Sequence, residues 1–110
     1  GTEDRNRVSF IMACPGRADF VEKFKKVGKN PAEYGWRGIR TGKYTYVMEL
    51  GYDVICNPKR YLYDIQNDPQ QKNTLDLDNE ENKQLAKTME EKVIKWLKRQ
   101  NDGFYKNWNS

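Results

Sequence analysis

The chain has 110 residues, enough for one domain, and it contains no histidine. Its net charge of +4 comes from 20 basic residues interspersed with 16 acidic ones, a distribution that favours a solvated mixed surface over a segregated basic tract. Without histidine the usual general base near neutral pH is missing, which excludes Ser-His and Cys-His nucleophile pairs and histidine metal sites. No apolar run approaches the length of a membrane span, so we expect no membrane partner.

The N-terminal part predicts a strand followed by a short helix. Residues 7–14 form an apolar run that Pro15 and Gly16 close, which is typical of a buried strand ending in a turn. Asp19 can cap the helix, and Gly28 ends it. The apolar side of this helix is expected to consist of Phe20, Phe24 and Val27.

From Trp36 onward the apolar pattern changes to a period of two. Residues 36–41 and 44–50 flank a turn at Gly42 and predict a hairpin, and residues 61–65 predict a third strand. Residues 66–69, Gln-Asn-Asp-Pro, predict a turn. Four tyrosines fall on alternating positions and are expected to pack under a helix as one sheet face. They are Tyr44, Tyr46, Tyr61 and Tyr63.

The last predicted element is a long amphipathic helix. Asp78 or Asn79 can cap it, acidic residues occupy its first turn, and Gly103 is expected to stop it. Its apolar stripe would consist of Leu85, Met89, Val93, Trp96 and Leu97. The whole chain, 1–110, is thus predicted to be a single α+β domain. A small antiparallel sheet of three or four strands would be covered by the long C-terminal helix, with a short N-terminal helix beside it.

The two cysteines predict no redox or metal chemistry. Cys14 and Cys56 are too few for a disulfide framework and form no paired metal-ligand motif. We favour two unpaired thiols, although one bridge between them stays open because spacing alone does not set geometry. Cys14 also begins a Cys-Pro-Gly-Arg run that is similar to the sulfatase maturation motif Cys-x-Pro-x-Arg, but here the proline and the arginine each come one position early.

Clustered acidic and basic residues are interpreted as turns and solvated surfaces. Asp76, Asp78 and Glu80 have the spacing that opens a calcium loop, but Glu81 stands where that loop needs glycine and Lys87 where it needs its bidentate glutamate. The chain has no glycine-rich phosphate loop. The period-two tyrosines favour a packed sheet over a platform for nucleic-acid bases. The lysines of the short helix are expected to form a solvated face: Lys23, Lys25, Lys26 and Lys29.

The order of the motifs over residues 36–104 resembles the C-terminal subdomain of sulfatases similar to N-sulphoglucosamine sulphohydrolase and the polysaccharide sulfatases of gut bacteria. The run Trp-Arg-Gly-Ile-Arg-Thr-Gly-Lys-Tyr-Thr-Tyr matches one block of that family. Leu62, Tyr63, Asp64, Asp68 and Pro69 match a second block, and a capped helix follows. Residues 1–35 resemble the family more weakly, through the strand that ends in Pro-Gly. Only residues 17–35 separate this Pro-Gly from the Trp-Arg block, where the family has a far longer segment, so the chain is a trimmed piece, a deletion or a degenerate copy.

The resemblance implies a structural rather than a catalytic role. The formylglycine cysteine, the calcium ligands and the sulfate-binding residues of the family belong to an N-terminal catalytic domain, which would be the main partner, so no catalytic or metal residue is assigned here. Calcium and formylglycine are implied only for that domain. Arg37, Arg40 and Lys43 are candidates for facing a sulfated carbohydrate or the catalytic domain. The implied setting is periplasmic, extracellular or lysosomal. The residues expected to stabilise the fold of the subdomain are Trp36, Tyr44, Tyr46, Tyr63, Asp64, Asp68, Pro69 and Trp96.

Two other hypotheses remain open from the sequence. The chain could be a stand-alone basic α+β module that binds an anionic polymer, either glycosaminoglycan or nucleic acid, of which nucleic acid is the less favoured. A subdomain separated from its partner could also form a homodimer through the exposed docking face.

Overall fold

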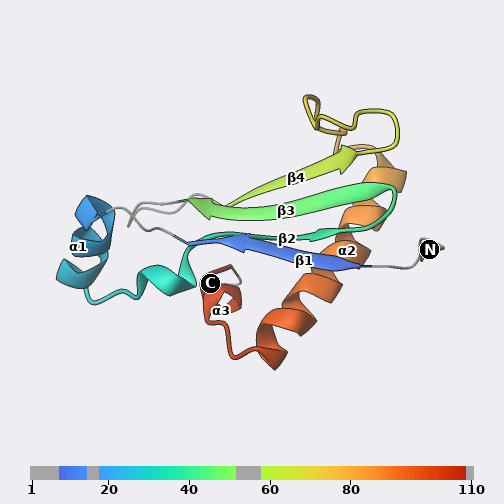
Figure 1. The fold of residues 1–110 in the computed structure, drawn as a ribbon. Helices are drawn as coiled ribbons and strands as arrows, with labels where there is room; N and C mark the ends of the chain where they lie inside the picture. The colour runs from blue at the N-terminus through green and yellow to red at the C-terminus, as the bar shows by residue number, and fades with distance from the viewer. Residues whose placement is uncertain (1–7, 15–17, 52–57, 109–110) are drawn as a thin grey trace, which may run out of the picture.

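The computed structural model describes residues 8–14, 18–51 and 58–108. Its elements are β1 (Ser9–Ala13), α1 (Ala18–Lys26), the 3-10 helix η1 (Pro31–Glu33), β2 (Gly35–Arg40), β3 (Tyr44–Gly51), β4 (Lys59–Asp64), α2 (Glu80–Arg99) and α3 (Phe104–Trp108). The strands form one four-stranded antiparallel sheet in the order β1-β2-β3-β4, and α2 lies across one of its faces (Figure 1). The predicted α+β architecture is therefore confirmed.

Strand register divides the sheet into a helix face and an open face. Ile39 pairs with Tyr46, which pairs with Leu62, and all three are buried on the face that α2 covers. Tyr61 and Tyr63 point to the other face, because they pair with Val47 and Thr45. The prediction that all four tyrosines share one face under a helix is thus wrong for Tyr61 and Tyr63. We call this second surface the open face. Its members include Ile11, Trp36, Arg40, Val47, Glu49, Lys59, Tyr61 and Tyr63.

The N-terminal elements differ from the sequence expectation in two respects. Strand β1 is not buried: it lies at the edge of the sheet, and Phe10 and Met12 remain 37% and 46% exposed. Helix α1 begins at Ala18, one residue before Asp19, the predicted cap. Gly28 does end the helix, with φ of +73°, and the Lys29 amide donates to the Phe24 carbonyl at 2.8 Å. The predicted turn at Pro15 and Gly16 lies outside the described residues.

Helix α2 begins where the sequence predicts and ends earlier. The Asn79 side chain caps it by accepting from the amides of Glu81 and Asn82. At the other end Asn101, with φ of 56°, replaces the expected Gly103 as the left-handed residue, and the Asp102 amide donates to the Leu97 carbonyl at 2.9 Å. This early stop leaves room for α3, which the sequence analysis did not predict.

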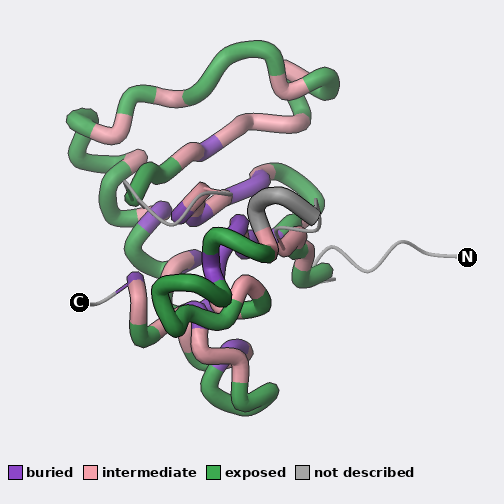
Figure 2. The backbone as a smooth tube through the Cα atoms, turned by 90° about the vertical axis from the view of Figure 1, so that its left-hand side faces the viewer, coloured by how far each residue is buried: buried purple, intermediate pink, exposed green. Residues whose placement is uncertain are grey.

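The core lies between the helix face of the sheet and the two C-terminal helices. Figure 2 shows that the buried residues are concentrated in the middle of the molecule and that exposed residues occupy the outer loops. Ala86, Met89, Val93 and Leu97 form the buried stripe of α2, whereas Leu85 and Trp96 are only partly buried. The other fully or nearly fully buried side chains are Phe24, Tyr34, Ile39, Tyr46, Met48, Leu50, Leu62, Phe104 and Trp108.

Candidate functional site

Arg37, a predicted substrate-rim residue, is completely buried on the helix face of the sheet. Its Nε donates to the Asp102 carboxylate at 2.7 Å, and a second bond from Nη2 reaches the other oxygen at 3.2 Å. The remaining guanidinium hydrogens donate to carbonyl oxygens, the shortest being that of Ala32 at 2.7 Å. The Arg37 guanidinium thus donates to acceptors within this chain, and the side chain does not reach the surface.

Arg40 and Lys43 lie apart from Arg37, at the end of the β2–β3 hairpin. Both residues are exposed, and Arg40 belongs to the open face. Thr41 shapes the turn between them, because its hydroxyl oxygen accepts from the amides of Lys43 and Tyr44. The three predicted rim residues thus do not converge: two share the hairpin end and one is enclosed.

Glu90 of α2 is the centre of a polar cluster on the helix face. Its Oε1 accepts from the Tyr46 hydroxyl at 3.0 Å, from Arg60 Nε at 3.1 Å and from Trp108 Nε1 at 3.1 Å. Burial, and then the adjacent Glu90 charge, raise the pKa of Tyr46 far above its ordinary value. Tyr46 therefore stays neutral, and the cluster ties β3, β4, α2 and α3 together.

Helix α3 is held between two arginines by aromatic stacking. Phe104 and Trp108 stack on each other with ring centroids 6.0 Å apart. The Arg37 guanidinium lies 4.6 Å from the Phe104 ring centroid, and that of Arg60 lies 4.7 Å from the Trp108 centroid. These contacts were not predicted from the sequence, although it carries two signals of them: Glu90 lies beside the apolar stripe of α2, and aromatic residues follow Gly103.

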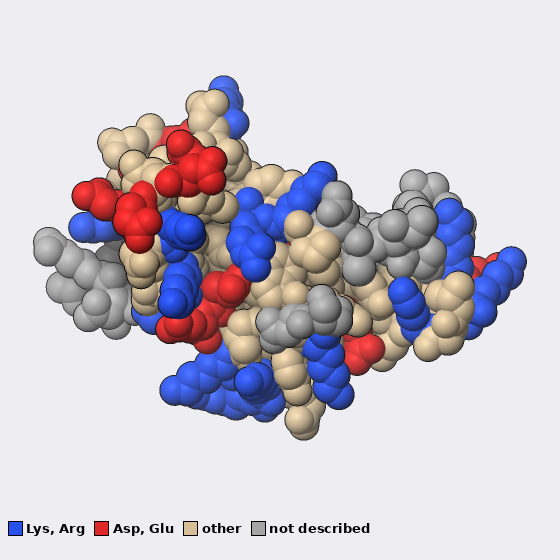
Figure 3. All heavy atoms as spheres, turned by 180° about the vertical axis from the view of Figure 1, so that it is seen from behind, with Lys and Arg blue, Asp and Glu red and all other residues tan. Residues whose placement is uncertain are grey.

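A cavity of about 440 Å³ lies next to the Glu90 cluster, between the N-terminal half of α2 and the sheet. Lys83 and Lys87 are exposed and stand one turn apart on α2, while Arg60 comes from β4 and its side chain is 48% exposed. Figure 3, which views the molecule from behind, shows lysine and arginine side chains interleaved with acidic ones on this side. We call the cavity the cationic groove, and its lining residues are Tyr46, Arg60, Leu77, Lys83, Ala86, Lys87 and Glu90.

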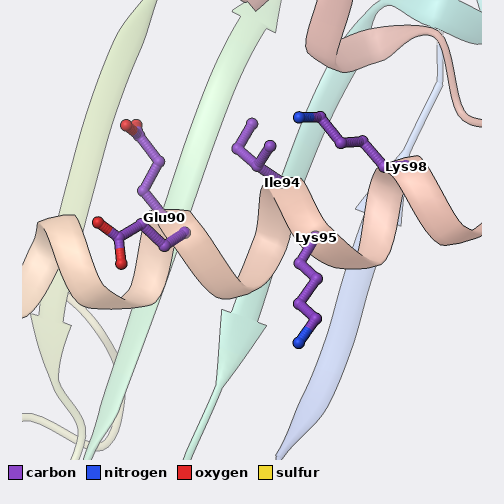
Figure 4. A pocket seen from close by; sticks show the side chains of 5 residues that line it. Glu90, Ile94, Lys95 and Lys98 are labelled. Carbon is purple, nitrogen blue, oxygen red and sulfur yellow. The ribbon is translucent and has the colours of Figure 1, made fainter.

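A second hollow, of about 310 Å³, borders the outer surface of α2. Figure 4 shows Glu90, Ile94 and Lys98 on one side of the helix and Lys95 extending to the other. Its charged groups do not converge on a common point, so this hollow has no arrangement for binding one ligand.

The acidic residues of the predicted turns bond to their own backbone. Asp64 accepts from the amides of Gln66 and Asn67 and from the Asn67 side chain, and the bonds from Asn67, chiefly that of its side chain, lower the pKa of Asp64. Asp68 accepts from the amides of Lys72 and Asn73 at 3.2 and 2.9 Å. These carboxylates organise the loop after β4 in the way that Asp side chains stabilise turns.

Other residues expected to hold the subdomain are distributed over both faces. Trp96 stacks on Phe10 with ring centroids 4.6 Å apart, and Tyr44 packs against the core. Trp36 is partly buried on the open face, while Pro69 is exposed in the loop after β4. Burial raises the pKa of Tyr63, and the nearby Tyr61 and Glu49 add to this effect.

Metal-ligand clusters and membrane-spanning helices are absent from residues 8–14, 18–51 and 58–108. There, no three cysteine, aspartate or glutamate side chains come together as a metal site, and no helix is long and apolar enough to cross a membrane. Cys14 is a free thiol whose Sγ donates to the Ala32 carbonyl at 3.7 Å. Cys56, its only candidate partner, lies outside the described residues.

Comparison with known proteins identifies the fold. No protein-family model matches the chain, and no curated protein matches it. Among solved structures it is similar to the candidate sulfatase yidJ from Bacteroides fragilis, with a TM-score of 0.62 and 27% identity over 94% of this chain and 18% of that one. It is also similar to a 4S-sulfatase from a glycosaminoglycan-metabolism locus of Bacteroides thetaiotaomicron, with a TM-score of 0.58 and 26% identity over 96% of this chain and 20% of that one.

The chain spans about one fifth of the length of the solved sulfatases that it matches. Nearly all of it is covered in both matches, so the likeness includes the N-terminal strand and helix as well as the predicted 36–104 core. The chain therefore corresponds in structure to one subdomain of a sulfatase.

Proposed function

We propose that this chain is the C-terminal subdomain of a sulfatase that hydrolyses sulfate esters of carbohydrate, and that it is not catalytic by itself. The main support for this proposal is a structural match that covers 94% of this chain but only 18% of a sulfatase chain. The carbohydrate substrate is supported by the second match, a 4S-sulfatase from a locus for glycosaminoglycan metabolism. The corresponding setting is periplasmic, extracellular or lysosomal, and calcium and formylglycine would belong to the catalytic domain.

The open face is the surface that we assign to the catalytic domain. Ile11, Val47 and Tyr61 form one cross-strand row there, and all are only partly buried. The Thr45 hydroxyl on the same face is buried and, within the described part of the chain, has no hydrogen-bond partner. A second domain would cover the apolar row.

Arg40 and Lys43 are proposed to face the substrate rim or the domain boundary. Both are exposed at the hairpin end next to the open face, and an arginine there can bind a sulfate through two parallel hydrogen bonds. Arg37 has no free donor for this purpose, so its proposed role is to hold the subdomain together.

The test is to determine the natural reading frame around this chain and to assay its full product with calcium and a sulfated chromogenic ester. We expect an upstream Cys-x-Pro-x-Arg or Ser-x-Pro-x-Arg motif, activity in the full product and none in the 110-residue chain. A reading frame without such a motif, or activity in the 110 residues alone, would overturn the proposal.

The interface is tested by mixing the separately purified catalytic domain with this chain. Val47→Asp should abolish co-elution, because it places a charge in the apolar row, while the exposed α1 change Lys26→Asp should leave co-elution intact. Circular dichroism of both variants controls for folding. Retained co-elution of Val47→Asp would assign the interface elsewhere. Light scattering of the native chain and of Val47→Asp would show whether the chain forms a homodimer through the same face.

A further inference from the structure

We propose that the cationic groove binds an anionic saccharide, with Lys83, Lys87 and Arg60 contacting its sulfate or carboxylate groups. The groove lies on the helix face of the sheet, opposite the surface assigned to the catalytic domain, so it would be a second saccharide-binding site on the subdomain. Its volume of about 440 Å³ lies within the range of ligand pockets.

Among the described residues, the two lysines of the groove are not neutralised by an acidic partner. Glu90 is the one acidic side chain among the lining residues, and its carboxylate already accepts bonds from Tyr46, Arg60 and Trp108. In the described segments Lys83 and Lys87 take part in no ion pair. Asp76 and Asp78 flank Leu77 in sequence but do not line the groove.

Arg60 is positioned to present its outer guanidinium atoms to a ligand. Its Nε is engaged by Glu90 and its plane lies over the Trp108 ring, which fixes the orientation of the group. Over the described residues its only ion pair runs from Nε to Glu90, and its two terminal nitrogens are the atoms that can bind a sulfate or carboxylate through two bonds.

The apolar part of the groove favours a saccharide over a nucleic acid. Leu77 and Ala86 contribute aliphatic surface, on which the C–H face of a sugar ring can pack. Bases of single strands need an exposed aromatic ring for stacking, but Tyr46 is only 1% exposed and the 7% exposed Trp108 lies under Arg60. The choice of a sulfated sugar as the ligand also rests on the proposed function, whereas the geometry of the groove does not.

The experiment titrates the 110-residue chain with a size-defined heparin oligosaccharide by calorimetry at several salt concentrations. The test variant is Lys83→Gln/Lys87→Gln, and the matched control is Lys25→Gln/Lys26→Gln on α1, which removes the same charge from exposed helix positions. We expect the groove variant to weaken binding about tenfold and to flatten the salt dependence, with the control changing affinity less than about twofold. Amide shifts in the NMR spectrum should concentrate near Leu77 and Ala86.

Four results would overturn the proposal. They are the absence of binding at low salt, an equal loss in both double variants, unchanged affinity for an oligosaccharide that is both desulfated and carboxyl-reduced, and tighter binding of a single-stranded DNA oligonucleotide at the same lysines. Circular dichroism confirms that the variants remain folded. This experiment measures binding to the 110-residue chain, whereas the sulfatase proposal is tested by the upstream motif and the activity of the full product. The two proposals can therefore fail independently.

Discussion

Arg37 and Arg60 stand in the same row of the sheet and have opposite environments. Met48 separates them, since it pairs with Arg37 on one side and with Arg60 on the other. Each arginine pairs with a carboxylate of the C-terminal region and stacks on an aromatic ring of α3. Nevertheless the Arg37 side chain is 0% exposed and that of Arg60 is 48% exposed.

The difference shows that position in the sheet decides what an arginine can do. Arg37 is on β2, an inner strand, where α3 and η1 close over it and carbonyl oxygens take up its donors. Arg60 is on the edge strand β4, where its side chain stays about half exposed beside Glu90. One arginine therefore stabilises the fold, and the other remains available to a ligand.

The largest expected effect comes from removing the enclosed arginine. Arg37→Met should lower the free energy of unfolding by about 3 kcal/mol or more, because Asp102 and several carbonyls lose their partner in a buried setting. Arg60→Met, the matched change in the same row, should lower it by about 1 kcal/mol or less, since this pair is half exposed. Urea unfolding of both variants measures the comparison, and equal losses would contradict it.

A smaller effect is expected at Tyr46, which links the Arg60 pair to the core through Glu90. Tyr46→Phe should lower the free energy of unfolding by about 1 kcal/mol at neutral pH, because one hydrogen bond is lost.

Tyr46 should also make the free energy of unfolding depend on pH in the alkaline range. Because the pKa of Tyr46 is raised on folding, its contribution is complete below the ordinary tyrosine pKa of about 10 and falls at higher pH by up to about 1.4 kcal/mol per pH unit. In unfolding measured against pH, the difference between the native chain and Tyr46→Phe should therefore shrink above about pH 10. Tyr61→Phe leaves the Tyr46–Glu90 bond intact and should retain the alkaline decline. Because the pKa of Tyr63 is also raised, a smaller decline should remain in Tyr46→Phe, and a decline of unchanged size there would assign it to other groups.

The smallest expected effect is that of Asn101→Gly, in the turn that precedes Asp102 and Phe104. Asn101 has φ of 56°, which glycine adopts without the steric penalty of a Cβ atom. Asn101→Gly should therefore be neutral or stabilise by a few tenths of a kcal/mol, whereas Asn101→Val should destabilise by about 1 kcal/mol or more. Thermal unfolding of the two variants checks this, and destabilisation by glycine would mean that the asparagine side chain contributes a contact of its own.

The sequence by itself determined the local elements of this protein. Period-two alternation predicted the hairpin, a capping residue and an apolar stripe predicted α2, and Gly28 predicted the end of α1. These signals are readable because they depend on neighbours within a few positions of each other. The ordered motif blocks added the resemblance to a sulfatase subdomain, which the structural matches support.

Only the tertiary structure decided which residues meet across long separations. Strand register moved Tyr61 and Tyr63 to the open face, because a strand's alternation shows two faces without naming the one that a helix covers. The pairing of Arg37 with Asp102, 65 positions away, turned a predicted rim residue into a buried one. The cationic groove likewise forms from β3, β4, α2 and the loop before it, so no local pattern could have indicated it.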